Sequence, residues 1–166
     1  MNRSAQIGVE PPAASWTIQR ASHEDVAGVV VAVQELLLEL GSTPPSAPVL
    51  KAVVRELIDD RDAGVVLVAR ARGEIVGVLA ASWQLAIHVP GRYALIQDLW
   101  VHSAWRSRSI GADLMTALVE LAREQGMSRV EVGLPRESFG GIEATEAFYR
   151  DNGFAPLGPR MRRLLS

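Results

Sequence analysis

The chain has 166 residues, of which 48% are hydrophobic, and its formal net charge at pH 7 is −2. This length and composition suit one domain with a core that buries roughly two-thirds of the surface of the unfolded chain. The small negative charge argues against a protein that coats nucleic acid, because sequence-independent DNA affinity comes from the neutralisation of many phosphates. The chain contains no cysteine, which excludes disulfides, thiolate metal sites and a cysteine nucleophile.

The N-terminal residues, MNRSAQIGVEPPAAS, lack an apolar core of signal-peptide length. No stretch of about 18 apolar residues occurs in the chain either. We therefore expect a flexible segment at 1–14, a single domain at 15–166, and a cytoplasmic protein with neither a membrane nor a nucleic acid as partner.

The first secondary-structure elements can be predicted from capping residues and apolar spacing. A strand is expected over 16–20, and Ser22 with Asp25 three residues later is typical of a helix N-cap. A helix should follow this cap, with apolar residues at helical spacing from Val26 to Leu40, and a second helix is expected over 47–60. The STPPSAP loop between these two helices is the segment best suited to act as a mobile lid.

The rest of the chain predicts an α/β fold. An antiparallel meander of three strands is expected over 65–70, 75–83 and 93–101. A helix should follow from Ile110 to a stop near Gly126, and a short strand over 129–133 should lie parallel to the strand before that helix. With the tail 156–165 returning as a last strand, the expected structure is a mixed sheet of six or seven strands with helices on both faces.

The most informative segment is IQDLWVHSAWRSRSIGADLM, residues 96–115. An apolar strand runs into an arginine-rich turn, and this turn opens a helix near Ile110. The first turn of a helix leaves backbone N–H groups unpaired and carries about half a positive charge, so a pyrophosphate can bind there without a dedicated side chain. Arg106 and Arg108 add positive charge beside this anion cradle.

Two motifs resemble those of the GNAT superfamily of N-acetyltransferases. The segment Val101–Ala112 is similar to the family's acetyl-CoA-binding motif, VxxxxRxxxxGA, with Arg106–Gly111 in place of its Q/R-x-x-G-x-G/A core. Residues 144–154, ATEAFYRDNGF, resemble the closing motif A-x-x-F-Y-x-x-x-G-F, in which a helix delivers a tyrosine beside the cofactor sulfur. The two motifs stand in the family's order, about forty residues apart, and the resemblance covers roughly residues 15–165.

The resemblance implies a GNAT-like sheet that is splayed at the cofactor cleft. It also implies transfer of an acetyl group from acetyl-CoA, as co-substrate, to a primary amine by direct attack, without a metal. A small-molecule amine is the expected acceptor, because the chain has no appended peptide-recognition module. A protein N-terminal or lysine acetyltransferase, and a non-catalytic acyl-CoA-binding module of the same fold, are the alternatives. A homodimer is compatible with each of these functions.

The resemblance further assigns the site residues. Tyr149 would be the acid that reprotonates the leaving thiolate, although Phe148 and Tyr149 could also be core aromatics. In the family, a bulge splays the strand before the cradle, and backbone N–H groups of that strand pair with the pantetheine and face the thioester oxygen. The residues that would contact the cofactor are Leu99, Trp100, Val101, Arg106, Ser107, Arg108, Ser109, Ile110, Gly111, Ala112, Phe148 and Tyr149.

Asp98 is the candidate base that takes a proton from the acceptor ammonium, directly or through a water, because it interrupts an otherwise apolar strand. Burial should raise its pKa. The alternative is a structural carboxylate that binds backbone amides or an arginine. Gln97 could only orient a substrate, Glu137 is a weaker candidate base, and His102 follows the strand closely enough to reach the site.

Two positions depart from the family pattern. Ser109 stands where the family usually has glycine, and serine tolerates a close backbone approach more readily than a positive φ. Ile142 stands where members often carry an asparagine that touches the pantetheine. Both departures would suit a degenerate member that binds acyl-CoA poorly. Near the end of the chain, a basic run of Arg160, Arg162 and Arg163 is explained by a solvated face of the expected last strand.

Overall fold

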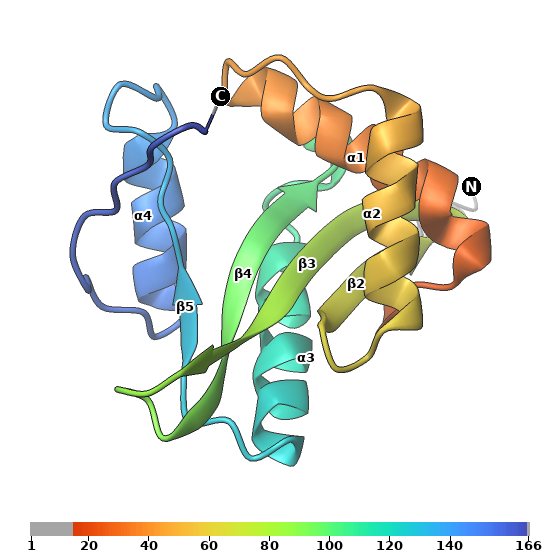
Figure 1. Ribbon diagram of the computed structural model, residues 1–166. Helices are drawn as coiled ribbons and strands as arrows, with labels where there is room; N and C mark the ends of the chain where they lie inside the picture. The colour runs from red at the N-terminus through yellow and green to blue at the C-terminus, as the bar shows by residue number, and fades with distance from the viewer. Residues whose placement is uncertain (1–14, 166) are drawn as a thin grey trace, which may run out of the picture.

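The computed structural model describes residues 15–165, which form a five-stranded mixed sheet with helices on both faces (Figure 1). The strands are β1 (Thr17–Arg20), β2 (Gly64–Ala71), β3 (Glu74–Ala86), β4 (Gly91–Val101) and β5 (Val130–Val132). The helices are α1 (Val26–Glu39), α2 (Ala47–Asp59), α3 (Ile110–Glu124) and α4 (Ile142–Asp151), with 3-10 turns η1 (His23–Asp25) and η2 (Ser103–Trp105). The flexible segment expected at 1–14 lies outside the described residues.

The strands follow the order β1-β2-β3-β4-β5, antiparallel throughout except for the parallel pair β4 and β5. The predicted meander and the parallel strand after α3 are therefore confirmed. The prediction of six or seven strands is wrong, because residues 154–165 form neither a helix nor a strand. Pro156 and Pro159 lack the N–H that a sheet ladder needs, and Gly158 between them has φ of 144°.

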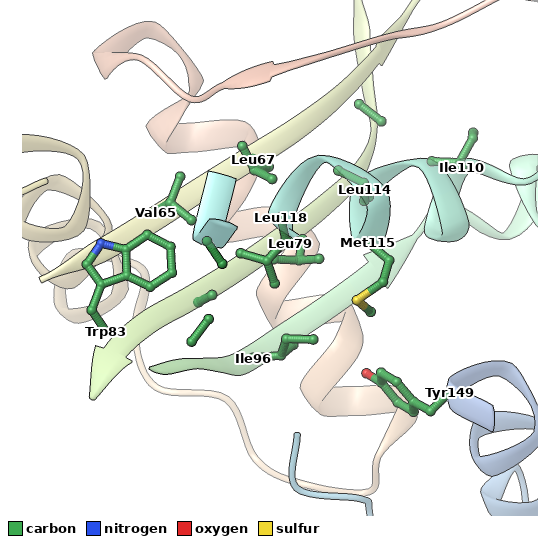
Figure 2. Packing of buried hydrophobic residues seen from close by; sticks show 14 of the residues in the cluster. Val65, Leu67, Leu79, Trp83, Ile96, Ile110, Leu114, Met115, Leu118 and Tyr149 are labelled. Carbon is green, nitrogen blue, oxygen red and sulfur yellow. The ribbon is translucent and has the colours of Figure 1, made fainter. Parts of the chain in front are cut away.

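The sheet is buried on both faces, and alternate residues of β2 belong to opposite cores. Val65 and Leu67 pack on the side of α3, whereas Val66 and Val68 pack on the side of α1 and α2. This alternation follows from the two-residue period of a strand. Figure 2 shows the α3 side, where Leu114 and Leu118 lie against Leu79 and Leu67.

Glycine at position 77 in β3 lets α3 approach this face closely. A Cβ at Gly77 would lie 2.8 Å from Ile110 Cγ2, 3.1 Å from Leu114 Cδ1 and 3.2 Å from Ala69 Cβ. Any side chain here would push the first turns of α3 away from the sheet. Gly77 therefore helps to fix the height at which the N-terminus of α3 stands over β4.

The predicted helix start at Ser22 is confirmed. Its backbone N–H donates to Asp25 Oδ2 at 2.8 Å, and the two residues form a capping box. The first turn is a 3-10 turn, and the α-helix proper begins at Val26. Asp25 is buried and accepts a second, charged hydrogen bond from Arg70, so its carboxylate is compensated.

The sheet opens between β4 and β5. Only Ala94–Ile96 of β4 pair with β5, while β4 itself continues to Val101. In the pairing with β3, Ala80 faces Asp98 and Ala81 faces Ile96, so Gln97 is an extra residue that forms a bulge. Beyond the bulge the two strands diverge, and Figure 1 shows α4 beside the upper half of the gap. The expected splay is present, and its bulge lies two residues before Leu99, the first strand residue expected to contact the cofactor.

Candidate active site

The turn that precedes α3 has a strained backbone. Ser107 and Ser109 adopt φ of 63° and 69°, in the left-handed region that favours glycine. Such a conformation costs a residue with a side chain about 1–2 kcal/mol and is often kept at functional sites. Of the two roles that a glycine could have at position 109, close approach or positive φ, the structure shows the positive φ. Serine thus takes the conformation for which the motif usually supplies glycine.

The N-terminus of α3 is open to an anion. Ser109 is the N-cap residue, and no side chain caps this helix end. The N–H groups of Ile110, Gly111 and Ala112 lie in the first turn, where an α-helix provides no internal acceptor. With the helix dipole behind them and the left-handed serines before them, these groups form the kind of concave backbone donor set that binds phosphates.

Arg106 forms an ion pair with a carboxylate at the end of α1. Its Nη2 lies 2.6 Å and 2.8 Å from the two carboxylate oxygens of Glu39, and its Nε donates to the backbone oxygen of Val101 at 3.1 Å. The expected free positive charge at this position is therefore largely neutralised. Instead, Arg106 joins the turn, the end of β4 and the end of α1.

Arg108 keeps its charge at the cradle but is held by an aromatic ring. Its guanidinium carbon lies 5.1 Å from the centroid of the Trp105 ring, and that of Arg72, in the turn between β2 and β3, lies 6.0 Å from the same ring. Both distances suit cation–π contacts. Two arginines therefore flank Trp105 next to the anion cradle.

Gly111 sets the contact between α3 and α4. A Cβ at Gly111 would lie 3.2 Å from both Cε2 and Cζ of the Phe148 ring and 3.8 Å from Val101 Cγ2. The two sequence motifs thus touch: the glycine of the first leaves room for the phenylalanine of the second. This close contact positions α4, which carries Tyr149, against the start of α3.

Beyond the bulge, the backbone of β4 has a free edge. His102 N–H donates to the oxygen of Val76 in β3 at 2.9 Å, so residues 102 and 100 direct their backbone groups toward β3. By the alternation of an antiparallel ladder, Leu99 and Val101 direct theirs away from β3 and toward the gap. The backbone N–H groups of Leu99 and Val101 can therefore donate to a ligand in the gap, whereas the amide of Trp100 is directed toward β3.

Asp98 lies on the face of the sheet that α1 and α2 cover. It pairs with Ala80, a member of the core cluster on that side. Burial raises the pKa of the Asp98 carboxyl above its usual value. Among residues 15–165 no group forms a hydrogen bond or an ion pair with this carboxylate. The alternative of a structural carboxylate held by amides or an arginine therefore has no support in the described structure.

Tyr149 reaches the gap from the other face. Its ring is buried between Phe148 and Phe154, with centroids at 5.2 Å and 5.3 Å, and Figure 2 shows the side chain directed toward Met115 and Ile96. Burial, with a smaller contribution from the negative charge of Asp98, raises the pKa of the Tyr149 hydroxyl to about 12. Tyr149 is thus both a core aromatic and a neighbour of Asp98.

The other candidate site residues either lie away from the gap or form hydrogen bonds within the protein. Gln97 is exposed and donates to Ser82 Oγ at 2.8 Å, and His102 Nδ1 accepts from the backbone N–H of Ala104 at 3.1 Å to cap η2. Glu137 is exposed in the loop before α4, and Ile142 is the first residue of α4. Among residues 15–165 no three His, Cys, Asp or Glu side chains gather as metal ligands. Nor is any helix in this part of the chain long and apolar enough to cross a membrane.

Several contributors to the site were missed by the sequence analysis. They are Glu39, Arg72, Gly77 and Trp105. The partnership of Glu39 with Arg106 spans 67 residues, and no local pattern signals a contact of that range. Trp105 could have been singled out, because it stands one residue before the first arginine of the cradle.

Comparison with known proteins agrees with this geometry. The family model described as the acetyltransferase (GNAT) family matches residues 23–154. A search of curated protein sequences gives no significant match.

Solved structures share the fold. A transcriptional regulator from Bacillus halodurans is 22% identical, with a TM-score of 0.78 over 91% of this chain and 100% of the other. An aminoglycoside acetyltransferase from an uncultured soil metagenomic sample is 23% identical, with a TM-score of 0.74 over 92% and 99%. A protein of Clostridium acetobutylicum described as a predicted acetyltransferase, solved with acetyl-CoA, is 15% identical, with a TM-score of 0.76 over 90% and 96%. At these identities the likeness establishes the fold alone.

Proposed function

Because the chain belongs to the acetyltransferase (GNAT) family, we propose that it transfers an acetyl group from acetyl-CoA to the primary amine of a small molecule. The observation that carries this proposal is that Asp98 and Tyr149 lie on opposite faces of the sheet beside the gap, near enough for the charge of Asp98 to act on the Tyr149 hydroxyl. An acid and a base that differ in environment, placed at one gap, are typical of proton transfer chemistry.

The residues of the cradle fit acetyl-CoA. The uncapped first turn of α3 would hold the pyrophosphate, with Arg108 as the nearby positive charge. The free backbone N–H groups of Leu99 and Val101 would pair with the pantetheine and the thioester oxygen. When bound, acetyl-CoA supplies an acetyl group on a thioester whose sulfur leaves as a thiolate.

In this proposal, Asp98 accepts the proton of the attacking ammonium. Its carboxylate has no hydrogen-bond partner among residues 15–165, and its raised pKa makes it a stronger base than an exposed aspartate. It lies on the α1 and α2 face, so the amine would approach from that side while the cofactor occupies the side of α3 and α4.

In this proposal, Tyr149 returns a proton to the departing sulfur. A phenol with a pKa of about 12 is a weak acid toward a thiolate, whose conjugate acid has a pKa of about 8.5 in an ordinary thiol. Once Asp98 has taken the ammonium proton, its negative charge is gone, and one of the two causes of the raised pKa of Tyr149 goes with it. The first proton transfer thus makes Tyr149 a better acid for the second.

The test is the substitution Tyr149→Phe, with Tyr93→Phe as the matched control. We expect Tyr149→Phe to retain acetyl-CoA affinity and to lose at least about tenfold in thiol release from acetyl-CoA in the presence of an amine. Tyr93→Phe should leave both unchanged, because Tyr93 lies in the paired half of β4 next to Ala94. Unchanged turnover in Tyr149→Phe would contradict the proposed acid. Binding without turnover toward any amine, in the unsubstituted protein, would instead favour a non-catalytic acyl-CoA-binding module.

A further inference from the structure

Three arginines gather at a surface cavity beside the gap. The cavity measures about 540 Å³ and is lined by Arg136, Arg160, Met161 and Arg162. Arg136 belongs to the loop that leads from β5 to α4, and the other three belong to the C-terminal tail. Figure 1 shows this tail crossing in front of the loop, on the viewer's side, where α2 also lies. Residues far apart in the sequence thus form one basic surface, which we name the arginine pocket.

The arginine pocket opens on the acceptor side of the sheet. Val130 and Val132 pack on the core of the α3 side, so the alternation of β5 directs the side-chain position of residue 133 to the opposite face. Arg160 occupies that position: its Nη1 would lie 2.9 Å from a Cβ placed on Gly133. Arg160 therefore lies over β5 on the face that carries Asp98, away from the cradle at α3.

Asp98 and Arg160 stand on the two sides of the splay. Val132 pairs with Ile96, Gly133 follows Val132, and Asp98 follows Ile96 by two residues. At about 3.3 Å per residue and about 4.8 Å between paired parallel strands, the backbones of Gly133 and Asp98 would lie about 6 Å apart if the pairing continued, and the divergence of the strands adds to this distance. This span matches a small molecule with an amine at one end and a second polar group at the other.

The pocket has unbalanced positive charge. Among residues 15–165, no carboxylate forms an ion pair with Arg136, Arg160 or Arg162. Glu131, on the same face of β5, is paired with Arg129 at 3.3 Å. Neighbouring guanidinium groups without counter-charges attract an anion, and they favour carboxylates and phosphates, to which they can donate two parallel hydrogen bonds.

We propose that the acceptor is a small primary amine that also carries an anionic group, a carboxylate or a phosphate, which the arginine pocket binds while the amine faces Asp98. This inference rests on the proposed acetyl transfer and specifies its substrate class. It sets the chain apart from a binder of polycationic aminoglycosides, since a polycation would meet like charges at Arg160 and Arg162.

Equilibrium binding to the protein saturated with CoA tests the proposal. The probes are the L-amino acids, each beside its own carboxamide, O-phosphoethanolamine beside ethanolamine, and kanamycin as a polycation. We expect at least one anionic amine to bind about tenfold or more tightly than its neutral counterpart, because hydrogen bonds to charged groups contribute enough binding free energy for a difference of that size. The amino acids and O-phosphoethanolamine distinguish a carboxylate from a phosphate.

Substitution identifies the arginines responsible. Arg160→Gln and Arg162→Gln should remove the preference for the anionic member of the pair and leave the KM for acetyl-CoA unchanged. Arg163→Gln, the matched control, removes the same charge one residue away from the pocket lining and should keep the preference. The proposal is overturned if no anionic amine binds more tightly than its neutral counterpart, if kanamycin is preferred, or if the arginine variants change the KM for acetyl-CoA instead. Thiol release is measured separately, so that selective binding without turnover would contradict the acetyl transfer rather than the pocket.

Discussion

Asp98 and Tyr149 lie on opposite faces of the sheet beside the gap, and burial, with a smaller contribution from the charge of Asp98, raises the pKa of the Tyr149 hydroxyl to about 12. Asp98 comes from β4, just after the bulge, and Tyr149 comes from α4, which Phe148 and Gly111 hold against α3. Neither segment alone would create this pair. The pair exists because β4 and β5 stop pairing after Ile96.

The first prediction concerns pH. Burial raises the pKa of Asp98, so the folded state holds this proton more tightly than the unfolded state, and the stability that Asp98 contributes is lost as the pH rises through its folded pKa. Asp98→Asn should therefore raise the free energy of unfolding at pH 7 by about 1 kcal/mol. The same substitution should abolish the acid limb of kcat/KM, which in the unsubstituted protein lies above the pH range of an ordinary aspartate. Urea unfolding and rate profiles from pH 4 to about pH 9 measure both effects.

An acid limb that persists in Asp98→Asn would show that another group accepts the proton. A lower stability at pH 7 would show that the carboxylate is compensated in the folded protein. Tyr149 should contribute no alkaline limb below a pH of about 11, because its pKa is raised to about 12.

Ser109→Gly should stabilise the protein. The φ of 69° destabilises the folded protein by about 1 kcal/mol or more when the residue is serine, whereas glycine adopts this conformation without strain. Part of this stabilisation is lost because glycine has more conformational entropy in the unfolded chain. We expect Tm to rise by about 2 °C. Ser128→Gly, at an exposed position without positive φ, is the control and should lower Tm or leave it unchanged. A drop in Tm for Ser109→Gly would mean that the serine side chain stabilises the turn.

Gly77→Ala should destabilise the fold although alanine is otherwise tolerated in a strand. The added methyl group would lie 2.8 Å from Ile110 and 3.1 Å from Leu114, and α3 would have to move outward. Overpacking of this kind costs about 1–3 kcal/mol. Since α3 carries the cradle, the affinity for acetyl-CoA should fall as well, measured by calorimetric titration. Gly140→Ala, at a position where a Cβ would meet nothing within 4 Å, is the control; an equal loss there would refute the packing argument.

Glu39→Gln should strengthen the binding of acetyl-CoA at low salt. The substitution leaves the Arg106 guanidinium without its counter-charge beside the cradle, and the added attraction should lower Kd by about two- to fivefold and fade as ionic strength rises. Stability should change by less than about 1 kcal/mol, because the pair is half exposed. Glu35→Gln removes the same charge from α1 and should have no effect. A higher Kd in Glu39→Gln would show that the ion pair shapes the turn more than it neutralises it.

Local patterns predicted most of the fold. The spacing of apolar residues gave α2, α3 and the end of α1 within about two residues of their observed ends. The capping pair Ser22 and Asp25 located the start of the 3-10 turn that leads into α1. The last strand expected over 156–165 is absent, because Pro156 and Pro159 lack the N–H groups that a ladder needs. Strand formation there depends on a ladder partner, which local sequence does not reveal.

The parts of the site that are contiguous in the sequence could be predicted, whereas the contacts between distant segments could not. Ser107 to Ala112 form the uncapped turn as one segment, and Phe148 with Tyr149 follow at the expected place in α4. The neutralisation of Arg106 by Glu39 and the gathering of Arg136 with the tail arginines depend on the tertiary fold. The backbone direction of Leu99 and Val101 depends on the β3 register and could not be known from the strand alone.

The proposed acetyl transfer requires the turn before α3 to bind acetyl-CoA. The most direct measurement is a calorimetric titration of the purified protein with acetyl-CoA, run beside CoA and ATP. We predict micromolar binding of acetyl-CoA and CoA, and much weaker binding of ATP, because the gap offers the backbone donors of Leu99 and Val101 to a pantetheine that ATP lacks. No detectable binding of acetyl-CoA, or a preference for ATP, would contradict the assignment of the cradle and with it the proposed acetyl transfer.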